Sequence, residues 1–267
     1  MRGIEAFALS TRQTGEYIRV PHSCFAERLG DLITLTASEA GALARLEDRP
    51  RDLRRGAILL REHDPLSELY ILKRGMAMSY VLLDDGSRQI LRFLFPGDML
   101  AVSALVYRDS PETIVAMTDL TVCAFDRAMM AGLLTEHPRL AAIIMVMNQM
   151  EKGALTDRLA ALGRTSAKAR VAALLLEIRN RIRRSDPASL HDFLLPLTQE
   201  EIGDATGLTA VHVNRMLRQL EEDGMIAREA GRVTFTDEAA LSRAANYVDR
   251  FDGLDLRWIP PPSEMAR

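Results

Sequence analysis

The spacing of hydrophobic positions changes along the chain and predicts several kinds of structure. Residues 25–46 place leucines at helical spacing, and Ser38 before Glu39 marks the start of a second short helix. Residues 54–125 instead contain short apolar runs separated by turn residues, which is typical of an antiparallel barrel or sandwich. Asp85-Gly86 lies between two of these runs and predicts a type I′ hairpin turn. The predicted strands are residues 57–60, 69–72, 76–83, 90–95, 114–117 and 121–125.

A helical period returns over residues 128–162. Pro138 suits the first turn of a long helix, and the apolar stripe that follows is longer than one small barrel can cover. We therefore predict that a second copy of the helix covers it in a parallel, coiled-coil-like seam. Packing of the stripe on its own barrel is the alternative. The predicted dimer-interface residues are Leu140, Ile143, Ile144, Met147, Met150 and Ala154.

The next predicted helix, residues 166–184, has one apolar and one basic face. Val171, Leu174, Leu175 and Ile178 are expected to be buried. The opposite face is expected to be exposed and basic, and it directly precedes the most specific motif in the chain. Its residues are Lys168, Arg170, Arg179, Arg181, Arg183 and Arg184.

Residues 197–221 carry the spacing of a helix-turn-helix. Thr198 and Glu201 form a capping box at the start of the first helix. Gly203 is small where a second helix must cross, and Gly207 closes the first helix. The glycine-centred turn within residues 224–236 predicts the hairpin wing of a winged helix. A helical pair inside a structural core is the alternative.

The second helix of this motif would present its outer face to the DNA major groove. We expect Arg215 to read guanine, Val211 to touch a thymine methyl and Asn214 to read adenine. His212 could donate to a phosphate or to guanine, whereas threonine hydroxyls and Arg218 are predicted phosphate contacts. The predicted DNA-binding residues are Thr198, Thr209, Ala210, Val211, His212, Asn214, Arg215 and Arg218.

Composition narrows the classes of function. A net charge of -3 over 267 residues excludes a chain that is basic throughout but allows a local basic surface. Two cysteines exclude a disulfide scaffold and a four-cysteine zinc or iron–sulfur site within one chain. The longest apolar run, residues 140–147, is far shorter than the roughly 20 residues of a membrane span. We therefore expect a cytoplasmic protein that does not contact a membrane.

An enzyme is not expected. A metal-dependent barrel of the cupin type needs several histidines on adjacent strands, whereas residues 54–125 contain only His63. A regulatory subunit that binds nucleotide and no DNA is a third class, and the helix-turn-helix argues against it. No metal site is predicted.

The order of barrel, long helix, basic helix, helix-turn-helix and wing resembles the CRP/FNR superfamily of bacterial transcription regulators. The resemblance rests on YILKRG at residues 70–75, FPGD at 95–98 and TQEEIG at 198–203. It implies an α+β fold with an N-terminal antiparallel β-roll of the cyclic-nucleotide-binding type, a long dimerisation helix and a C-terminal winged helix-turn-helix. It also implies a homodimer that reads palindromic double-stranded DNA and contacts RNA polymerase.

The expected boundaries follow from this resemblance and from the sequence pattern. They are an N-terminal tail over 1–25, the sensor roll over 26–130, the dimerisation helix over 131–164, the DNA-binding domain over 165–246 and a C-terminal tail over 247–267. The C-terminal tail contains Trp258 and three consecutive prolines, and we expect it to be loose. Docking through Trp258 is the alternative.

Departures from the family pattern concern the effector. Members that bind cyclic AMP hold the ribose with a glutamate and the phosphate with an arginine. Here Val102 stands at the first position and Glu112 at the second, where a carboxylate would repel the phosphate. We therefore predict that cyclic AMP does not bind. The candidate effector-pocket residues are Ala101, Val102, Ser103, Glu112 and Thr113.

No cofactor is predicted. Cys123 stands where oxygen-sensing members carry their barrel cysteine, but only Cys24 lies upstream and the N-terminal cysteine group is missing. Cys123 is therefore interpreted as a small buried strand residue. A haem-based sensor of NO or CO, a redox-responsive regulator, or a regulator without effector stays open as an alternative. The candidate haem ligands are His22, His63 and His137, with Met145, Met147 and Met150 near a pocket.

Overall fold

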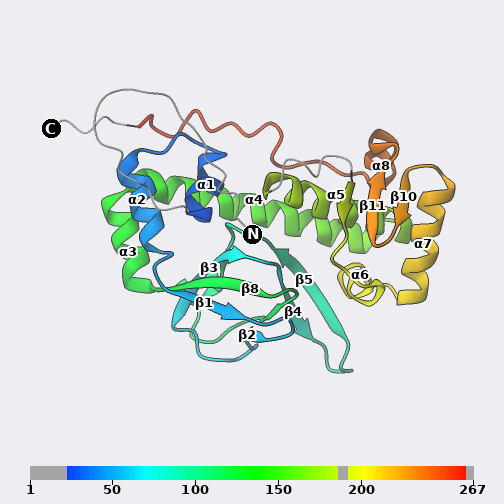
Figure 1. Ribbon diagram of the computed structural model, residues 1–267, viewed down its shortest axis with the longest axis horizontal. Coiled ribbons are helices and arrows are strands. Elements are labelled where there is room, and N and C mark those ends of the chain that lie inside the picture. Colours follow the sequence, from blue (N-terminus) through cyan, green and yellow to red (C-terminus); the bar gives the residue numbers. More distant parts are fainter. Residues whose placement is uncertain (1–22, 186–191, 263–267) are drawn as a thin grey trace, which may run out of the picture.

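The computed structural model describes residues 23–185 and 192–262, so the candidate ligand His22 lies outside the described residues. Two short helices, α1 (Cys24–Gly30) and α2 (Ala37–Arg45), lead into a β-roll (Figure 1). The second helix starts earlier than predicted. The hydroxyl of Thr36 accepts from the Glu39 amide at 3.1 Å, and the Glu39 carboxylate accepts from the Thr36 amide at 2.8 Å. This capping box places Ser38 inside the helix.

The predicted antiparallel barrel is confirmed as a roll of two four-stranded sheets. One sheet has the order β1-β8-β3-β6 and the other β2-β7-β4-β5, with every pairing antiparallel. Two strands were missed, because β1 is largely exposed and polar and β6 has only two residues. The strands are β1 (Pro50–Leu53), β2 (Ile58–Leu60), β3 (Glu68–Arg74), β4 (Ala77–Leu82), β5 (Arg88–Leu94), β6 (Met99–Leu100), β7 (Thr113–Ala116) and β8 (Leu120–Asp126).

The predicted type I′ turn between β4 and β5 is wrong. That turn needs two successive residues with positive φ, but only Gly86 has one, at 81°. The Leu83 amide donates to the Ser87 carbonyl at 2.9 Å, so the hairpin loop is longer and one glycine is enough. The Asp85 carboxylate holds this loop by accepting from the Ser87 amide at 2.9 Å.

The helical region after the roll is bent. Helix α3 (Arg127–Glu136) meets α4 (Pro138–Arg164) at 117°, and Pro138 begins α4 as predicted. Within the described residues no single helix is long and apolar enough to cross a membrane, and only this bent pair passes such a test by length and composition.

Leu140, Ile143 and Ile144 are at most 7% exposed, because they pack into the core of their own roll. For these three predicted dimer-interface residues, the structure therefore shows the alternative, packing on the chain's own roll.

The C-terminal part forms a second compact unit (Figure 1). Its three-stranded sheet has the order β10-β11-β9, and strand β9 was not predicted. Ala230 and Gly231 both have positive φ, which confirms the predicted hairpin wing. The elements are α5 (Ala167–Ser185), β9 (Asp192–Leu194), α6 (Gln199–Thr206), α7 (Ala210–Glu222), β10 (Ile226–Glu229), β11 (Arg232–Phe235) and α8 (Glu238–Ala245).

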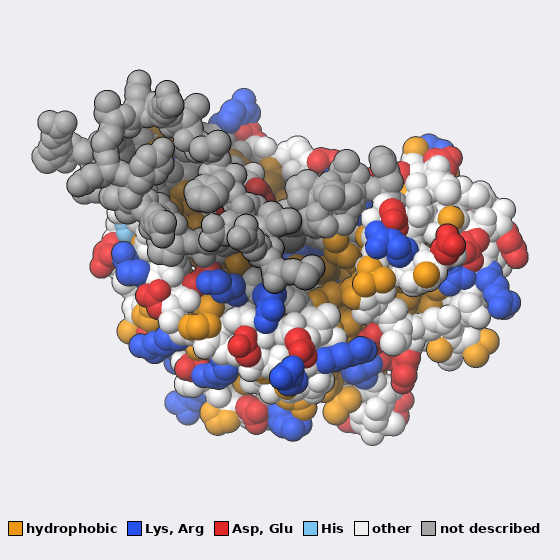
Figure 2. Space-filling view, in the orientation of Figure 1, with side chains coloured by type: hydrophobic (Ala, Val, Ile, Leu, Met, Phe, Trp, Pro, Cys, Tyr) orange, Lys and Arg blue, Asp and Glu red, His pale blue; other side chains and the backbone are white. Residues whose placement is uncertain are grey.

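Helix α5 buries its predicted apolar face, but its other face is not the exposed basic surface that was expected. Arg179 is 2% exposed and pairs with Glu238. Arg181 pairs with Asp98 of the roll, and Arg184 pairs with Asp249 at 3.2 Å. Carboxylates far away in sequence neutralise these guanidinium groups, of which Arg179 is buried and Arg181 and Arg184 are half-buried. In the view of Figure 2, Lys and Arg are interspersed with Asp and Glu over the surface.

The segment after α8 returns along α4 toward α2 (Figure 1). Ile259 is 7% exposed within the N-terminal core, and Arg139 Nε of α4 donates to the Pro260 carbonyl at 2.8 Å. Arg250 forms two bonds with the Asp157 carboxylate, at 2.7 and 2.6 Å. The expectation of a loose tail is therefore wrong for residues up to 262. Trp258 is 55% exposed, so Ile259 is the anchor.

Candidate functional site

The helix-turn-helix is built by local interactions that the sequence predicted. Thr198 and Glu201 form the capping box of α6, with the Thr198 amide donating to the Glu201 carboxylate at 2.7 Å. Gly207 ends α6 in the left-handed conformation, at φ 67° and ψ 39°. The Thr209 hydroxyl then caps α7 by accepting from the His212 amide at 3.3 Å. Helix α7 buries its predicted stripe of Val213, Met216, Leu217 and Leu220.

Gly203 sets how closely the turn approaches α6. A Cβ atom at this position would lie 2.3 Å from the Leu208 carbonyl oxygen, which is backbone and cannot move away cheaply. We expect Gly203→Ala to lower the free energy of unfolding by about 1–3 kcal/mol. The matched control is Gly153→Ala in α4, where a Cβ would meet nothing and stability should rise by about 0.5–1 kcal/mol. Urea unfolding of both variants measures this, and equal effects would contradict the close approach.

The outer face of α7 is open to solvent. Val211 is 82% exposed, His212, Arg215 and Arg218 are exposed, and Ala210 and Asn214 are half-buried. The Arg215 guanidinium contacts the His212 ring one turn away. Within residues 23–185 and 192–262, no carboxylate forms an ion pair with Arg215 or Arg218. The predicted reading residues therefore share one face, and its two guanidinium groups have no acidic partner there.

The candidate effector residues of the roll lie on two segments. Ala101 has a φ of 55° and precedes the short 3₁₀ helix η1 (Val102–Leu105), which also contains Ser103. Glu112 is 7% exposed and lies just before β7. The first residue of β7 is Thr113, whose hydroxyl accepts a hydrogen bond from the Glu62 amide at 3.0 Å. Arg92 of β5 donates to Glu112 at 2.7 Å.

Arg92 also pairs with Glu151 of α4, at 3.4 Å. Burial alone would lower the pKa of Arg92, but Glu112 and Glu151 hold it above its ordinary value. The Glu112 carboxylate is therefore fixed in a buried ionic network that joins the roll to α4.

Cys123 is buried and Cys24 is half-buried, and both thiols have little nucleophilic character because their pKa values are raised. Cys123 is 0% exposed in β8, which confirms its interpretation as a small buried residue, and burial raises its pKa. The Cys24 thiol donates to the Lys73 carbonyl, and burial raises its pKa to about 11. Among the candidate haem ligands, the His63 side chain is 86% exposed and His137 lies at the bend before α4. No cluster of three metal-binding side chains occurs among the described residues.

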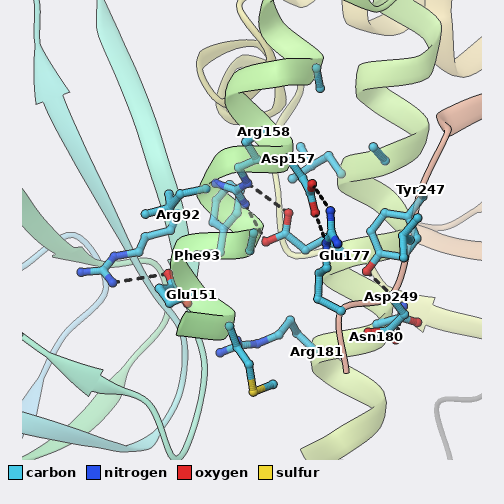
Figure 3. Close-up of a pocket in the computed structure, with 18 of the residues that line it drawn as sticks. Arg92, Phe93, Glu151, Asp157, Arg158, Glu177, Asn180, Arg181, Tyr247 and Asp249 are labelled. Carbon is cyan, nitrogen blue, oxygen red and sulfur yellow. Dashed lines mark hydrogen bonds and ion pairs between the residues drawn. The ribbon is translucent and has the colours of Figure 1, made fainter. Parts of the chain in front are cut away.

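A cavity of about 440 Å³ lies between the roll and the DNA-binding unit (Figure 3). Helices α4, α5 and α6, strand β5 and the segment after α8 contribute to its wall. Arg158 of α4 donates two hydrogen bonds to the Glu177 carboxylate of α5, at 3.1 and 2.7 Å. The sequence did not reveal this cavity. The only signal was the run of arginines on α5, whose side chains turn inward here.

Two family models match the chain, a cyclic nucleotide-binding domain over residues 50–137 and a Crp-like helix-turn-helix domain over residues 169–244. The nitrogen fixation regulation protein FixK of Bradyrhizobium diazoefficiens is 34% identical over 191 residues, covering 71% of this chain and 79% of the relative. The fumarate and nitrate reduction regulatory protein of Escherichia coli K12 is 25% identical over 84% of this chain and 90% of its own length.

A solved structure shares the fold. FixK2 from Bradyrhizobium japonicum superposes with a TM-score of 0.67 and 27% identity, over 75% of this chain and 98% of its own. The roll, the long helix and the winged helix-turn-helix thus occur here in the same order as in these regulators. The chain belongs to the CRP/FNR family of transcription regulators, which bind DNA through a helix-turn-helix and are not enzymes.

Proposed function

We propose that the protein acts in the cytoplasm as a homodimer that binds a two-fold symmetric DNA site and acts on RNA polymerase there. The observation that carries this proposal is the outer face of α7, on which His212, Arg215 and Arg218 are exposed beside Val211. Such a face near the start of a recognition helix has the position and the hydrogen-bond donors that major-groove reading requires.

The proposed dimer seam differs from the one expected from the sequence. Four apolar residues of α4 are exposed: Met145 (53%), Leu155 (40%), Leu159 (72%) and Leu162 (36%). Leu155, Leu159 and Leu162 follow one another at steps of four and three, the spacing of a coiled-coil stripe. Met147, Met150 and Ala154 are half-buried and flank this stripe. A second copy of α4 is the partner whose geometry fits a stripe of this spacing.

Base reading is assigned by the chemistry of each side chain. Arg215 would donate two hydrogen bonds to guanine, Val211 would contact a thymine methyl, and Asn214 would read adenine. Arg218 and the hydroxyls of Thr198 and Thr209 would contact phosphates, with His212 donating to a phosphate or guanine. Since Val211 cannot accept a bond from cytosine, the half-site should differ there from the half-sites of relatives that carry an acidic residue.

The proposed regulator does not respond to cyclic AMP and holds no resident cofactor. The buried Glu112 carboxylate, fixed by Arg92 at 2.7 Å, would face the cyclic phosphate with like charge. Selection of bound DNA from a random pool, with and without cyclic AMP, tests the function. We expect the same inverted repeat in both, with half-sites centred about 34 Å apart. Enrichment of no site, or of a site only with cyclic AMP, would contradict the proposal.

A further inference from the structure

Three arginines gather at one end of the cavity between the two units. Arg28 comes from α1, and Arg181 and Arg184 come from the C-terminal end of α5. The guanidinium carbons of Arg28 and Arg184 lie 4.9 and 3.0 Å from the centre of the Phe251 ring. The ring belongs to the segment after α8, so this group joins the N-terminal helix, the DNA-binding unit and the C-terminal segment.

The residues that line the whole cavity include eight arginines and five carboxylates. Asp98 pairs with Arg181, and Asp249 pairs with Arg184. No carboxylate of residues 23–185 and 192–262 forms an ion pair with Arg28. Arg28 Nε and Arg184 Nη1 are buried N–H donors without an acceptor among the described residues. Buried donors of this kind cost free energy until an acceptor reaches them.

Burial makes two of these guanidinium groups more acidic than usual. Burial lowers the pKa of Arg184 to about 10, with Arg28 and Arg181 acting in the same direction against Asp249. Burial, with Arg181, also lowers the pKa of Arg28, although Asp98, Asp31 and Glu151 act in the opposite direction. An added anion would relieve both effects, because it would pair with the excess charge.

The rest of the cavity wall includes apolar side chains. Phe93 of β5, Leu32 just after α1 and Leu174 of α5 belong to it. Its volume of about 440 Å³ lies within the range of small-molecule sites, roughly 300–1,000 Å³. A ligand that used both ends would need a charged group and an apolar body.

We propose that this cavity is an effector site for a small molecule in which an oxyanion, a phosphate or a carboxylate, is joined to an apolar body. The oxyanion would accept hydrogen bonds from the guanidinium groups of Arg28 and Arg184, which can bind an oxyanion in bidentate geometry. Val102 and Glu112, the positions aligned with the cyclic-nucleotide contacts of the family, do not line this cavity, although Arg92, which binds Glu112, does.

The effector role rests on the proposed function, and the fold offers a route for it. Ala205 and Thr206 of α6 line the same cavity. Asp204 beside them pairs with Arg88 of β5 at 2.7 Å, so α6 rests on the roll. A ligand that binds both units more tightly in one arrangement would shift how the recognition helices are oriented.

Thermal unfolding of the full chain tests the site with two probes, phenyl phosphate and phenylacetate, against sodium chloride at matched ionic strength. We expect at least one probe to raise the Tm saturably, by about 3–6 °C. Arg28→Gln should abolish this rise and leave the ligand-free Tm unchanged or higher, since it removes a charge that burial disfavours. Arg45→Gln, which removes an exposed arginine of α2, should keep the rise. The stronger probe distinguishes phosphorylated from carboxylated effectors.

Three results would overturn the site: no rise beyond that with chloride, an equal rise in Arg28→Gln, or a lowered ligand-free Tm of Arg28→Gln with the rise retained. If Arg28→Gln does not fold, hydrogen exchange of the unmodified protein, measured with and without the probe, tests the site instead. The probe should protect residues 24–30, 178–185 and 247–251, and protection only elsewhere would exclude the cavity. Mobility shifts without probe report on DNA binding separately, so failure of the proposed function is distinguishable from failure of this site.

Discussion

Replacing Arg215 with alanine is expected to abolish recognition of the selected DNA site while leaving the fold intact. A bidentate arginine–guanine contact contributes about 1–3 kcal/mol of discrimination, so a symmetric dimer would lose about 2–6 kcal/mol. This corresponds to a drop in affinity of roughly 30-fold to more than 10,000-fold. Arg215 is exposed and contacts His212, and no carboxylate of the described ranges pairs with it. Its removal should therefore leave no buried charge unpaired.

The measurement is a titration of selected and scrambled DNA at one salt concentration, because affinity for DNA depends steeply on salt. Arg243→Ala is the matched control, since Arg243 is an exposed arginine of α8 in the same unit. It removes the same charge away from the recognition helix. A similar loss on selected and scrambled DNA for Arg215→Ala would show that Arg215 contacts only phosphates, and the base-reading role would be wrong.

Leu159→Lys is expected to convert the protein from dimer to monomer. Leu159 is 72% exposed in the protomer, so the substitution removes little from its own core. In the proposed seam it would place two like charges opposite each other and desolvate them. Loss of such a central contact costs about 2–4 kcal/mol, or roughly 30- to 1,000-fold in the dissociation constant. DNA affinity should fall with it, because one recognition helix cannot hold two half-sites.

Sedimentation equilibrium measures the dimer constant, and circular dichroism checks that the variant is folded. Leu82→Lys is the control, because Leu82 is 58% exposed on the β4–β5 hairpin and lies outside the seam. We expect it to dimerise as the unmodified chain does. A Leu159→Lys protein that stays dimeric would place the interface on another face of the molecule.

The long helix shows why part of this site could not be predicted from sequence. Helical periodicity correctly located α4 and its proline start. Periodicity does not show whether the roll or a second copy of α4 covers a given side of the helix. Leu140, Ile143 and Ile144 face the roll because α3 turns the chain back by 117° and lays the start of α4 against the core. Leu159, further along α4, is 72% exposed, although the adjacent Arg158 still contacts Phe93 of the roll.

The arginines of α5 likewise show that a basic run in the sequence does not reveal whether its charges are exposed. A run of basic residues before a helix-turn-helix suggests a surface for phosphates, yet Arg179 is 2% exposed and Arg181 reaches Asp98 of the roll. A charge pattern along one helix does not show which carboxylates the fold brings to it. The cavity proposed as an effector site consists of such long-range pairs, including Arg184 with Asp249.

The sequence by itself determined the structures whose contacts lie within a few residues of one another. The capping box of Thr198 and Glu201 and the left-handed Gly207 are local, and they specify the helix-turn-helix wherever the unit sits. Only the tertiary structure decided the exposed face of α4, the docking of Ile259 and the arginine group at Phe251. These features join residues more than 60 positions apart, and their burial depends on how the elements pack together.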